Sequence, residues 1–176
     1  MNIFLKILLI GLSLIISFAA QAQLQTVKYV DLAKYSGTWY QIARNPHPFE
    51  YGCICARQIL VPTADARISV YNSCNDRTID GPYRTIQGFA SVLDATSNAK
   101  LSVDFGLPQK GAYWIIGLDT QYRYAVVSDP SKRTLYILSK TTTLENSLYN
   151  EAVQNAAIQL DTSKLSMTLQ QGCIFP

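Results

Sequence analysis

Hydrophobic and polar residues alternate with a period of two along much of the chain. The alternation is clearest in residues 100–105, where Leu101, Val103 and Phe105 fall on one face and polar residues on the other. Similar runs are rich in β-branched and aromatic residues, and turn-forming residues separate them. This pattern predicts eight β-strands, at residues 39–44, 54–61, 68–73, 85–93, 100–105, 113–118, 124–128 and 134–139.

The connections between these strands are mostly short, which favours antiparallel neighbours in an up-and-down order. A sheet of this size tends to close on itself, because closure removes its exposed edges. Eight strands enclose an interior that is just wide enough for one small ligand. The sequence therefore predicts an all-β fold, an eight-stranded up-and-down antiparallel β-barrel, with a two-sheet sandwich as the alternative.

The hydrophobic period changes to that of a helix near the C-terminal end, at residues 146–160. The apolar stripe consists of Leu148, Ala152, Val153, Ala156 and Ala157. We expect one amphipathic α-helix that packs on the outside of the barrel and has a structural role. A short last strand is expected at residues 164–169.

The first residues have the features of a signal peptide. Lys6 provides a short positive region, residues 7–18 are apolar, and Ala20-Gln21-Ala22 matches an A-x-A cleavage site. The apolar run is shorter than the roughly 20 residues that span a bilayer, and no cysteine for lipid attachment follows it. We therefore expect a signal peptide at residues 1–22 and one domain at residues 23–176, periplasmic or extracellular and without a stable membrane anchor.

Four cysteines follow the leader: Cys53, Cys55, Cys74 and Cys173. An even number of cysteines behind a signal peptide predicts two disulfides, for which three pairings are open. A zinc site is disfavoured, because Cys-x-Cys lacks the two-residue spacer of common structural zinc sites. Since Cys173 lies near the end of the sequence, its bridge is expected to hold the C-terminal tail against the barrel.

Composition and motifs narrow the class of function. The net charge is +3, without a run of Lys or Arg, so no nucleic-acid partner is expected. The one histidine, His47, lies between two prolines and is expected to be solvent-exposed. It is therefore a poor candidate for a catalytic triad or a haem ligand. Phosphate-binding loops, paired-His metal motifs and Gly-x-Ser-x-Gly are missing from the sequence. The prediction is a protein that is not an enzyme and uses no cofactor or metal.

Three segments resemble the lipocalin family. They are residues 31–44, which contain Gly37-Thr38-Trp39, residues 119–124 and residues 135–140. Each motif alone is weak, but the three occur in the order and at the spacing of the family, and the likeness extends over residues 23–176. Phe49-Glu50 followed by a glycine, and residues 113–119, are most similar to the bacterial lipocalin and apolipoprotein D branch.

The motif residues are expected to close one end of the barrel. Gly37 permits a tight entry into the first strand, and Trp39 is expected to plug the closed end with a large apolar side chain. In the family an Arg from the end of the eighth strand stacks on this Trp. Here the position is Lys140, which still places a cation over the indole but lacks the planar guanidinium.

The resemblance also implies which residues contact a ligand. Three inward positions of the apolipoprotein D branch correspond to Asn72, Tyr113 and Tyr136, the last of which is a Trp in that relative. Phe105 is expected to point inward by strand alternation, and so is Ala56, whose small side chain leaves room. We expect an apolar pocket in which Asn72 and the two Tyr hydroxyls orient the polar end of a ligand.

The expected function is to bind a small hydrophobic ligand for transport, storage or scavenging. The resemblance implies a fatty acid, a lysophospholipid or a similar lipid. At most a transient contact with membranes is expected, and a monomer or a weak homodimer. Two alternatives stay open: an interaction module whose barrel is unused, and a thiol-dependent isomerase of the lipocalin fold, which would need a free Cys53 or Cys55.

The resemblance implies a disulfide pairing as well. The segment Cys53-Ile54-Cys55-Ala56 matches the Cys-x-x-Ala of the family if Cys53 is the partner of the C-terminal cysteine. The prediction is therefore Cys53 with Cys173 and Cys55 with Cys74. The reverse assignment is nearly as good, because the second and third strands are neighbours.

Overall fold

The structure is a computed structural model that describes residues 23–176, so the predicted signal peptide lies outside the described residues. In chain order the elements are α1 (Leu32–Tyr35), β1 (Gly37–Arg44), η1 (Pro48–Glu50), β2 (Cys53–Pro62), β3 (Ile68–Asp76), β4 (Tyr83–Val92), β5 (Lys100–Asp104), β6 (Gly111–Leu118), β7 (Tyr124–Ser128), β8 (Leu135–Ser139), α2 (Asn146–Ala157) and β9 (Ser166–Met167). Within this part of the chain, no helix is long and apolar enough to cross a membrane.

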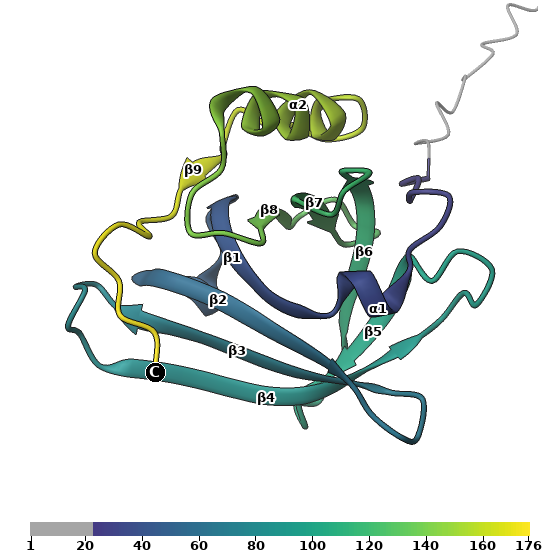
Figure 1. The fold of residues 1–176 in the computed structure, drawn as a ribbon, viewed down its shortest axis with the longest axis horizontal. Helices are drawn as coiled ribbons and strands as arrows, with labels where there is room; N and C mark the ends of the chain where they lie inside the picture. The colour runs from purple at the N-terminus through teal and green to yellow at the C-terminus, as the bar shows by residue number, and fades with distance from the viewer. Residues whose placement is uncertain (1–22) are drawn as a thin grey trace, which may run out of the picture.

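Strands β1 to β8 form a closed antiparallel barrel (Figure 1). Each strand from β2 to β8 pairs with the next along the chain, and β1 closes the ring by pairing with both β8 and β2. The predicted eight-stranded up-and-down barrel is therefore confirmed, and the sandwich alternative is wrong.

Several strands are longer than the hydrophobic pattern predicted. β3 continues to Asp76 and β4 begins at Tyr83, because the backbone pairing runs on through the polar positions Cys74↔Arg84 and Asn75↔Tyr83. Ladder hydrogen bonds need only backbone groups, so the side-chain alternation can stop before the strand does. The short helices α1 and η1 were not predicted.

The C-terminal tail fills a gap between β1 and β2. The two strands pair only as far as Tyr40↔Arg57 and then separate. At Ala43 and Arg44, β9 takes the place of β2 as the neighbour of β1. Beyond β9, Gln170 Nε2 donates to the carbonyls of Gln41 (2.8 Å) and Ala56 (2.7 Å). The predicted last strand is thus shorter than expected, and its neighbours satisfy backbone groups that the separation of β1 and β2 leaves free.

Helix α2 lies outside the barrel and packs against β6, β7 and β8, as predicted (Figure 1). Leu148, Ala152 and Ala156 are buried against the barrel wall, whereas Ala157 is exposed, so its place in the predicted stripe is wrong. Ala157 is the last residue of the helix, which ends three residues earlier than predicted and continues as a turn in which the Gln159 and Leu160 backbone N–H groups both donate to the Ala156 carbonyl.

The three family-like segments meet at one end of the barrel and close it. Trp39 is fully buried, and its Nε1 donates to the carbonyl of Tyr35 (2.7 Å). Lys140 Nζ lies 4.2 Å from the centre of the Trp39 ring and donates to the carbonyls of Tyr35 (3.3 Å) and Ser36 (2.5 Å). Tyr122, from the second segment, accepts a hydrogen bond from the Asp31 backbone N–H (2.8 Å). The lysine therefore takes the place over the indole that the family gives to arginine.

Candidate functional site

The half of the barrel away from Trp39 contains a cavity of about 600 Å³. This volume lies within the range of roughly 300–1,000 Å³ that is typical of small-molecule sites. The apolar part of its wall includes Ala56, Val70, Ile86, Val103, Phe105 and Leu138. The half nearer Trp39 is filled by a buried core cluster. The barrel therefore has one packed end and one hollow end.

Loops at the hollow end form the mouth of the cavity. Phe49 is 76% exposed and Leu107 is 50% exposed, and both line the cavity. Lys110 also lines it, and forms an ion pair with Asp104 at 3.1 Å. The cavity thus opens to solvent between the β1–β2 and β5–β6 connections.

The five predicted ligand contacts, Asn72, Tyr113, Tyr136, Phe105 and Ala56, all line this one cavity. They come from five different strands or strand ends, so the fold brings together residues that are far apart in the sequence. Asn72 Oδ1 is buried and has no hydrogen-bond partner. The Asn72 side-chain oxygen is thus free to accept a hydrogen bond from a ligand.

The Phe105 ring lies close to β4 at Gly88, which has no side chain. A Cβ atom built on Gly88 of β4 would lie 2.7 Å from Phe105 Cδ1 and 2.2 Å from the Asp104 carbonyl. Glycine is therefore required there for the close approach of β5 and of the ring that follows it.

Tyr113 forms the floor of the cavity, where its hydroxyl is already engaged. Gln58 Nε2 donates to the Tyr113 oxygen (2.5 Å), and the hydroxyls of Tyr113 and Tyr35 lie 2.8 Å apart. Burial raises the pKa of Tyr113 to about 12, so this hydroxyl stays neutral at physiological pH. The expectation that it orients the polar end of a ligand is thus not favoured by its contacts.

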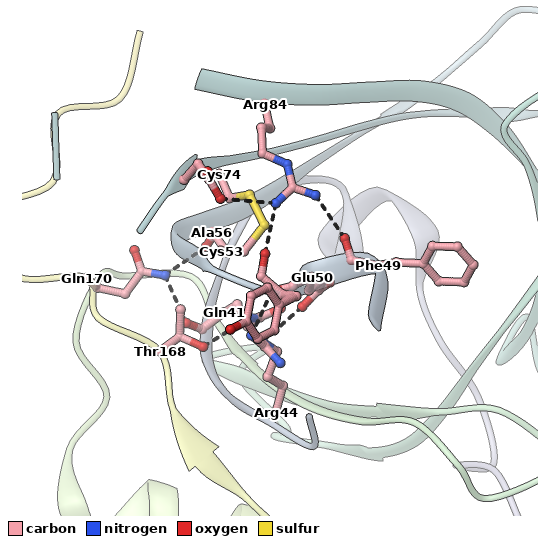
Figure 2. The surroundings of a disulfide bond; sticks show 12 residues. Gln41, Arg44, Phe49, Glu50, Cys53, Ala56, Cys74, Arg84, Thr168 and Gln170 are labelled. Atoms are coloured by element: carbon pink, nitrogen blue, oxygen red, sulfur yellow. Dashed lines mark hydrogen bonds and ion pairs between the residues drawn. A yellow bond between two sulfur atoms is a disulfide. The ribbon is translucent and has the colours of Figure 1, made fainter. Parts of the chain in front are cut away.

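A charged cluster lies on the wall near the mouth, around Glu50 (Figure 2). Arg44 Nε pairs with the Glu50 carboxylate at 3.1 Å, and Arg44 Nη2 donates to the Glu50 carbonyl at 2.8 Å. Gln41 contributes a donor at 3.0 Å from the same carboxylate. Burial raises the pKa of Glu50, and the charge of Arg44 and hydrogen bonds from Gln41 and Tyr136 oppose this shift. The Tyr136 hydroxyl is therefore held beside a carboxylate, at a different part of the cavity from Tyr113.

Arg84 connects the β4 strand to the mouth loop. Its Nη1 donates to the Tyr51 carbonyl (3.0 Å), and its Nη2 donates to the Phe49 carbonyl (3.1 Å). Figure 2 shows this guanidinium beside the Cys53–Cys74 disulfide, with the Phe49 ring pointing away from the cluster. Arg84 thus fixes the backbone of the loop while the aromatic side chain of the loop stays exposed.

His47 is not solvent-exposed as predicted. It is partly buried, it lines the cavity, and its Nδ1 atom is buried without a hydrogen-bond partner. Its ring centre lies 5.1 Å from that of Phe49. The reason is that the loop containing both residues folds over the mouth of the barrel instead of extending into solvent.

The predicted disulfide pairing is wrong, since Cys53 pairs with Cys74 and Cys55 with Cys173. A bulge in β2 explains the difference. The β2–β3 register shifts between Ile54 and Arg57, and Cys55 has a φ of 52°. Ala56 and Cys53 therefore both face the cavity although they are three residues apart, and Cys55 between them turns toward the tail. A regular strand would have placed both cysteines on one face.

All four cysteines of the sequence are paired in disulfides. Neither Cys53 nor Cys55 is available as a free thiolate, which removes the basis of the thiol-dependent isomerase alternative. The same pairing removes the zinc alternative, because thiolates are the metal ligands and a disulfide sulfur is not. Two disulfides are typical of proteins in oxidising compartments.

Several residues that line the cavity were not predicted from the sequence. Gln58 and Val70 could have been found by parity, because each lies two residues from a position already assigned to the inside, Ala56 and Asn72 respectively. Glu50 and Arg84 gave no such signal, because their positions depend on how the mouth loop folds.

Comparisons with known proteins agree with this architecture. The family model described as a lipocalin-like domain matches residues 30–170. The chain is 34% identical over 149 residues to the outer membrane lipoprotein Blc of Escherichia coli K12, covering 83% of this chain and 82% of that protein. It is 32% identical over 155 residues to apolipoprotein D of Macaca fascicularis, covering 81% and 78%. The structure of insecticyanin from the tobacco hornworm Manduca sexta superposes with a TM-score of 0.68 at 22% identity, covering 82% and 83%. This chain belongs to the lipocalin family.

Proposed function

We propose that this protein binds a small hydrophobic ligand in the barrel, a fatty acid, a lysophospholipid or a similar lipid, for transport, storage or scavenging. The observation that carries the proposal is the cavity of about 600 Å³, which has a largely apolar wall and opens at one end. Burial of an alkyl chain in such a space contributes about 0.8 kcal/mol per methylene. We further propose that a signal peptide at residues 1–22 directs the protein to the periplasm or the cell exterior, where disulfides form.

The charges at the mouth favour an acidic head group. Arg84 and Lys110 line the cavity, and their side chains are 43% and 64% exposed. Each already contacts a carbonyl or carboxylate of the protein, but guanidinium and ammonium groups have further donors. The Glu50 carboxylate is paired with Arg44. Asp76 and Asp104, the acidic partners of Arg84 and Lys110, do not line the cavity. A carboxylate or phosphate head at the mouth would therefore meet more basic than acidic side chains on the cavity wall, since within residues 23–176 Arg57, Arg84 and Lys110 line it against Glu50 alone.

A cavity-filling substitution tests the proposal. Ala56→Phe places a bulky side chain in the cavity, whereas Val61→Phe adds the same side chain on the same strand at a position that is 51% exposed. Displacement of a fluorescent fatty acid by oleic acid and by lysophosphatidylcholine measures the affinity. We expect Ala56→Phe to lower the affinity about tenfold or more and Val61→Phe to leave it unchanged.

Two results would overturn the proposal. The first is that the wild type binds none of these lipids, in displacement or as a thermal stabilisation at saturating ligand. The second is that both variants bind as tightly as the wild type, which would place the ligand outside the barrel. Organic extraction of the purified protein, followed by mass spectrometry, would identify any lipid that it retains.

A further inference from the structure

A small second void lies directly beneath the cavity floor. It has a volume of about 10 Å³ and is lined by Leu60, Val70, Ala90, Leu101, Val103 and Tyr113. Val70, Val103 and Tyr113 line the main cavity as well. The void is therefore next to the cavity, and Tyr113 is the largest of the three side chains that line both spaces.

Tyr113 is held in this position from below and from the side. Its hydroxyl bonds with Gln58 on β2 and with Tyr35 on α1, and its ring meets that of Tyr35 edge-on at 6.5 Å. Tyr35 in turn packs on Trp39 at 4.8 Å. Any movement of Tyr113 toward the void would break two buried hydrogen bonds, and the loss of one such bond lowers an equilibrium constant by about tenfold.

We propose that Tyr113 sets the length of alkyl chain that the barrel accepts, by stopping the end of the chain at the cavity floor. This inference rests on the proposed function and names the residue that determines its specificity. With the acidic head at Arg84 and Lys110, a linear chain extends between Val70 and Val103 toward Tyr113. Because the hydroxyl is already satisfied, an alkyl end can rest against the ring without removing a hydrogen bond from water or protein.

The experiment compares affinities for a series of saturated fatty acids of about ten to twenty carbons. In the wild type the affinity should rise about fourfold per methylene, reach a maximum, and fall for chains that no longer fit above Tyr113. Tyr113→Ala joins the cavity to the void, so its maximum should move to longer chains. A fatty acid two carbons longer than the wild-type optimum should bind Tyr113→Ala about sixteenfold more tightly than it binds the wild type, because two further methylenes are buried.

A second substitution tests the same idea without removing the floor. Val70→Phe narrows the bore just above the void, and its maximum should move to shorter chains. The matched control is Tyr71→Ala, because the Tyr71 hydroxyl contacts Tyr83 and the residue does not line the cavity. This control removes a tyrosine side chain, as Tyr113→Ala does, but from the position next to Val70. The chain length of maximum affinity should stay at its wild-type value.

The outcomes separate the two proposals. In one outcome, the wild type shows a chain length of maximum affinity that neither Tyr113→Ala nor Val70→Phe shifts. This result would overturn the role of Tyr113, while the proposed function stands. A shift in Tyr71→Ala equal to that in Tyr113→Ala would overturn it as well. If no fatty acid of any length binds the wild type, this proposal fails. The proposed function fails with it only if lysophosphatidylcholine does not bind either.

Discussion

The two disulfides close loops of very different length, which gives a quantitative prediction for their removal. Cys53 and Cys74 are 21 residues apart, whereas Cys55 and Cys173 are 118 residues apart. The perturbation is a pair of double variants, Cys53→Ala with Cys74→Ala and Cys55→Ala with Cys173→Ala. Each removes one bridge and leaves the other in place.

Chain entropy determines the expected magnitudes. A cross-link stabilises a protein by restricting its unfolded chain, and this effect grows with the logarithm of the loop length. For the 21-residue separation it is about 3.3 kcal/mol and for the 118-residue separation about 4.9 kcal/mol. The tail is also held by the hydrogen bonds of Gln170, so it can stay in place in the native state when its bridge is gone. The loss should therefore appear as a change in the unfolded state.

Urea unfolding, followed by tryptophan fluorescence, measures both losses. We expect the variant without the tail bridge to lose about 1.5 kcal/mol more than the other. Its m-value should rise, because the unfolded chain exposes more surface. A larger loss for the variant without the Cys53–Cys74 bridge would refute the reasoning. Peptide mapping without reduction checks that the remaining bridge is formed in both variants.

Two further predictions concern residues that hold the scaffold together. Lys140→Ala removes the cation over Trp39 and two hydrogen bonds to carbonyls, and should lower the unfolding free energy by about 2 kcal/mol. In the same urea titration, Lys140→Met should lose nearly as much and Lys140→Arg little or nothing, and equal stability of all three would contradict this. The hydrogen bonds of Arg123 hold the pKa of Asp119 at about 2, below the usual 3.9 or so. The ion pair therefore stabilises the protein above about pH 4 and is lost as the pH falls through about 2. Asp119→Asn should cost about 1–2 kcal/mol at neutral pH and flatten the pH dependence of stability in that window.

Strands with regular alternation could be predicted from the sequence. Residues 100–105 were predicted as a strand and form β5 (Lys100–Asp104), in which the buried Leu101 and Val103 alternate with partly exposed neighbours. Strand ends were less predictable, since pairing continues through polar residues such as Tyr83 and Arg84. The helix α1 could have been recognised from its N-cap, because the Asp31 side chain accepts from two backbone N–H groups of the first turn.

Parity along a strand found some of the cavity wall and failed where the strand is irregular. Phe105 and Ala56 were placed correctly on the cavity side, because the strand is regular from Ala56 to Leu60 and from Leu101 to Phe105. The bulge at Cys55 shifts the parity by one residue, and no local signal marks it. The disulfide pairing depends on that shift, so the sequence alone left it open between two nearly equal assignments.

The two ends of the barrel differ in what they can reveal about function. Trp39 and Lys140, from the first and third family-like segments, lie at the closed end, where they contact each other and backbone carbonyls. These contacts maintain the scaffold, and neither residue lines the cavity. Tyr113 and Asn72, which shape the cavity, lie outside these segments, and Tyr136 lines it from within the third one. Membership of the family therefore follows from the closed end, and the identity of the ligand depends on the wall, which is why the length series on Tyr113 variants is more informative than further comparison of motifs.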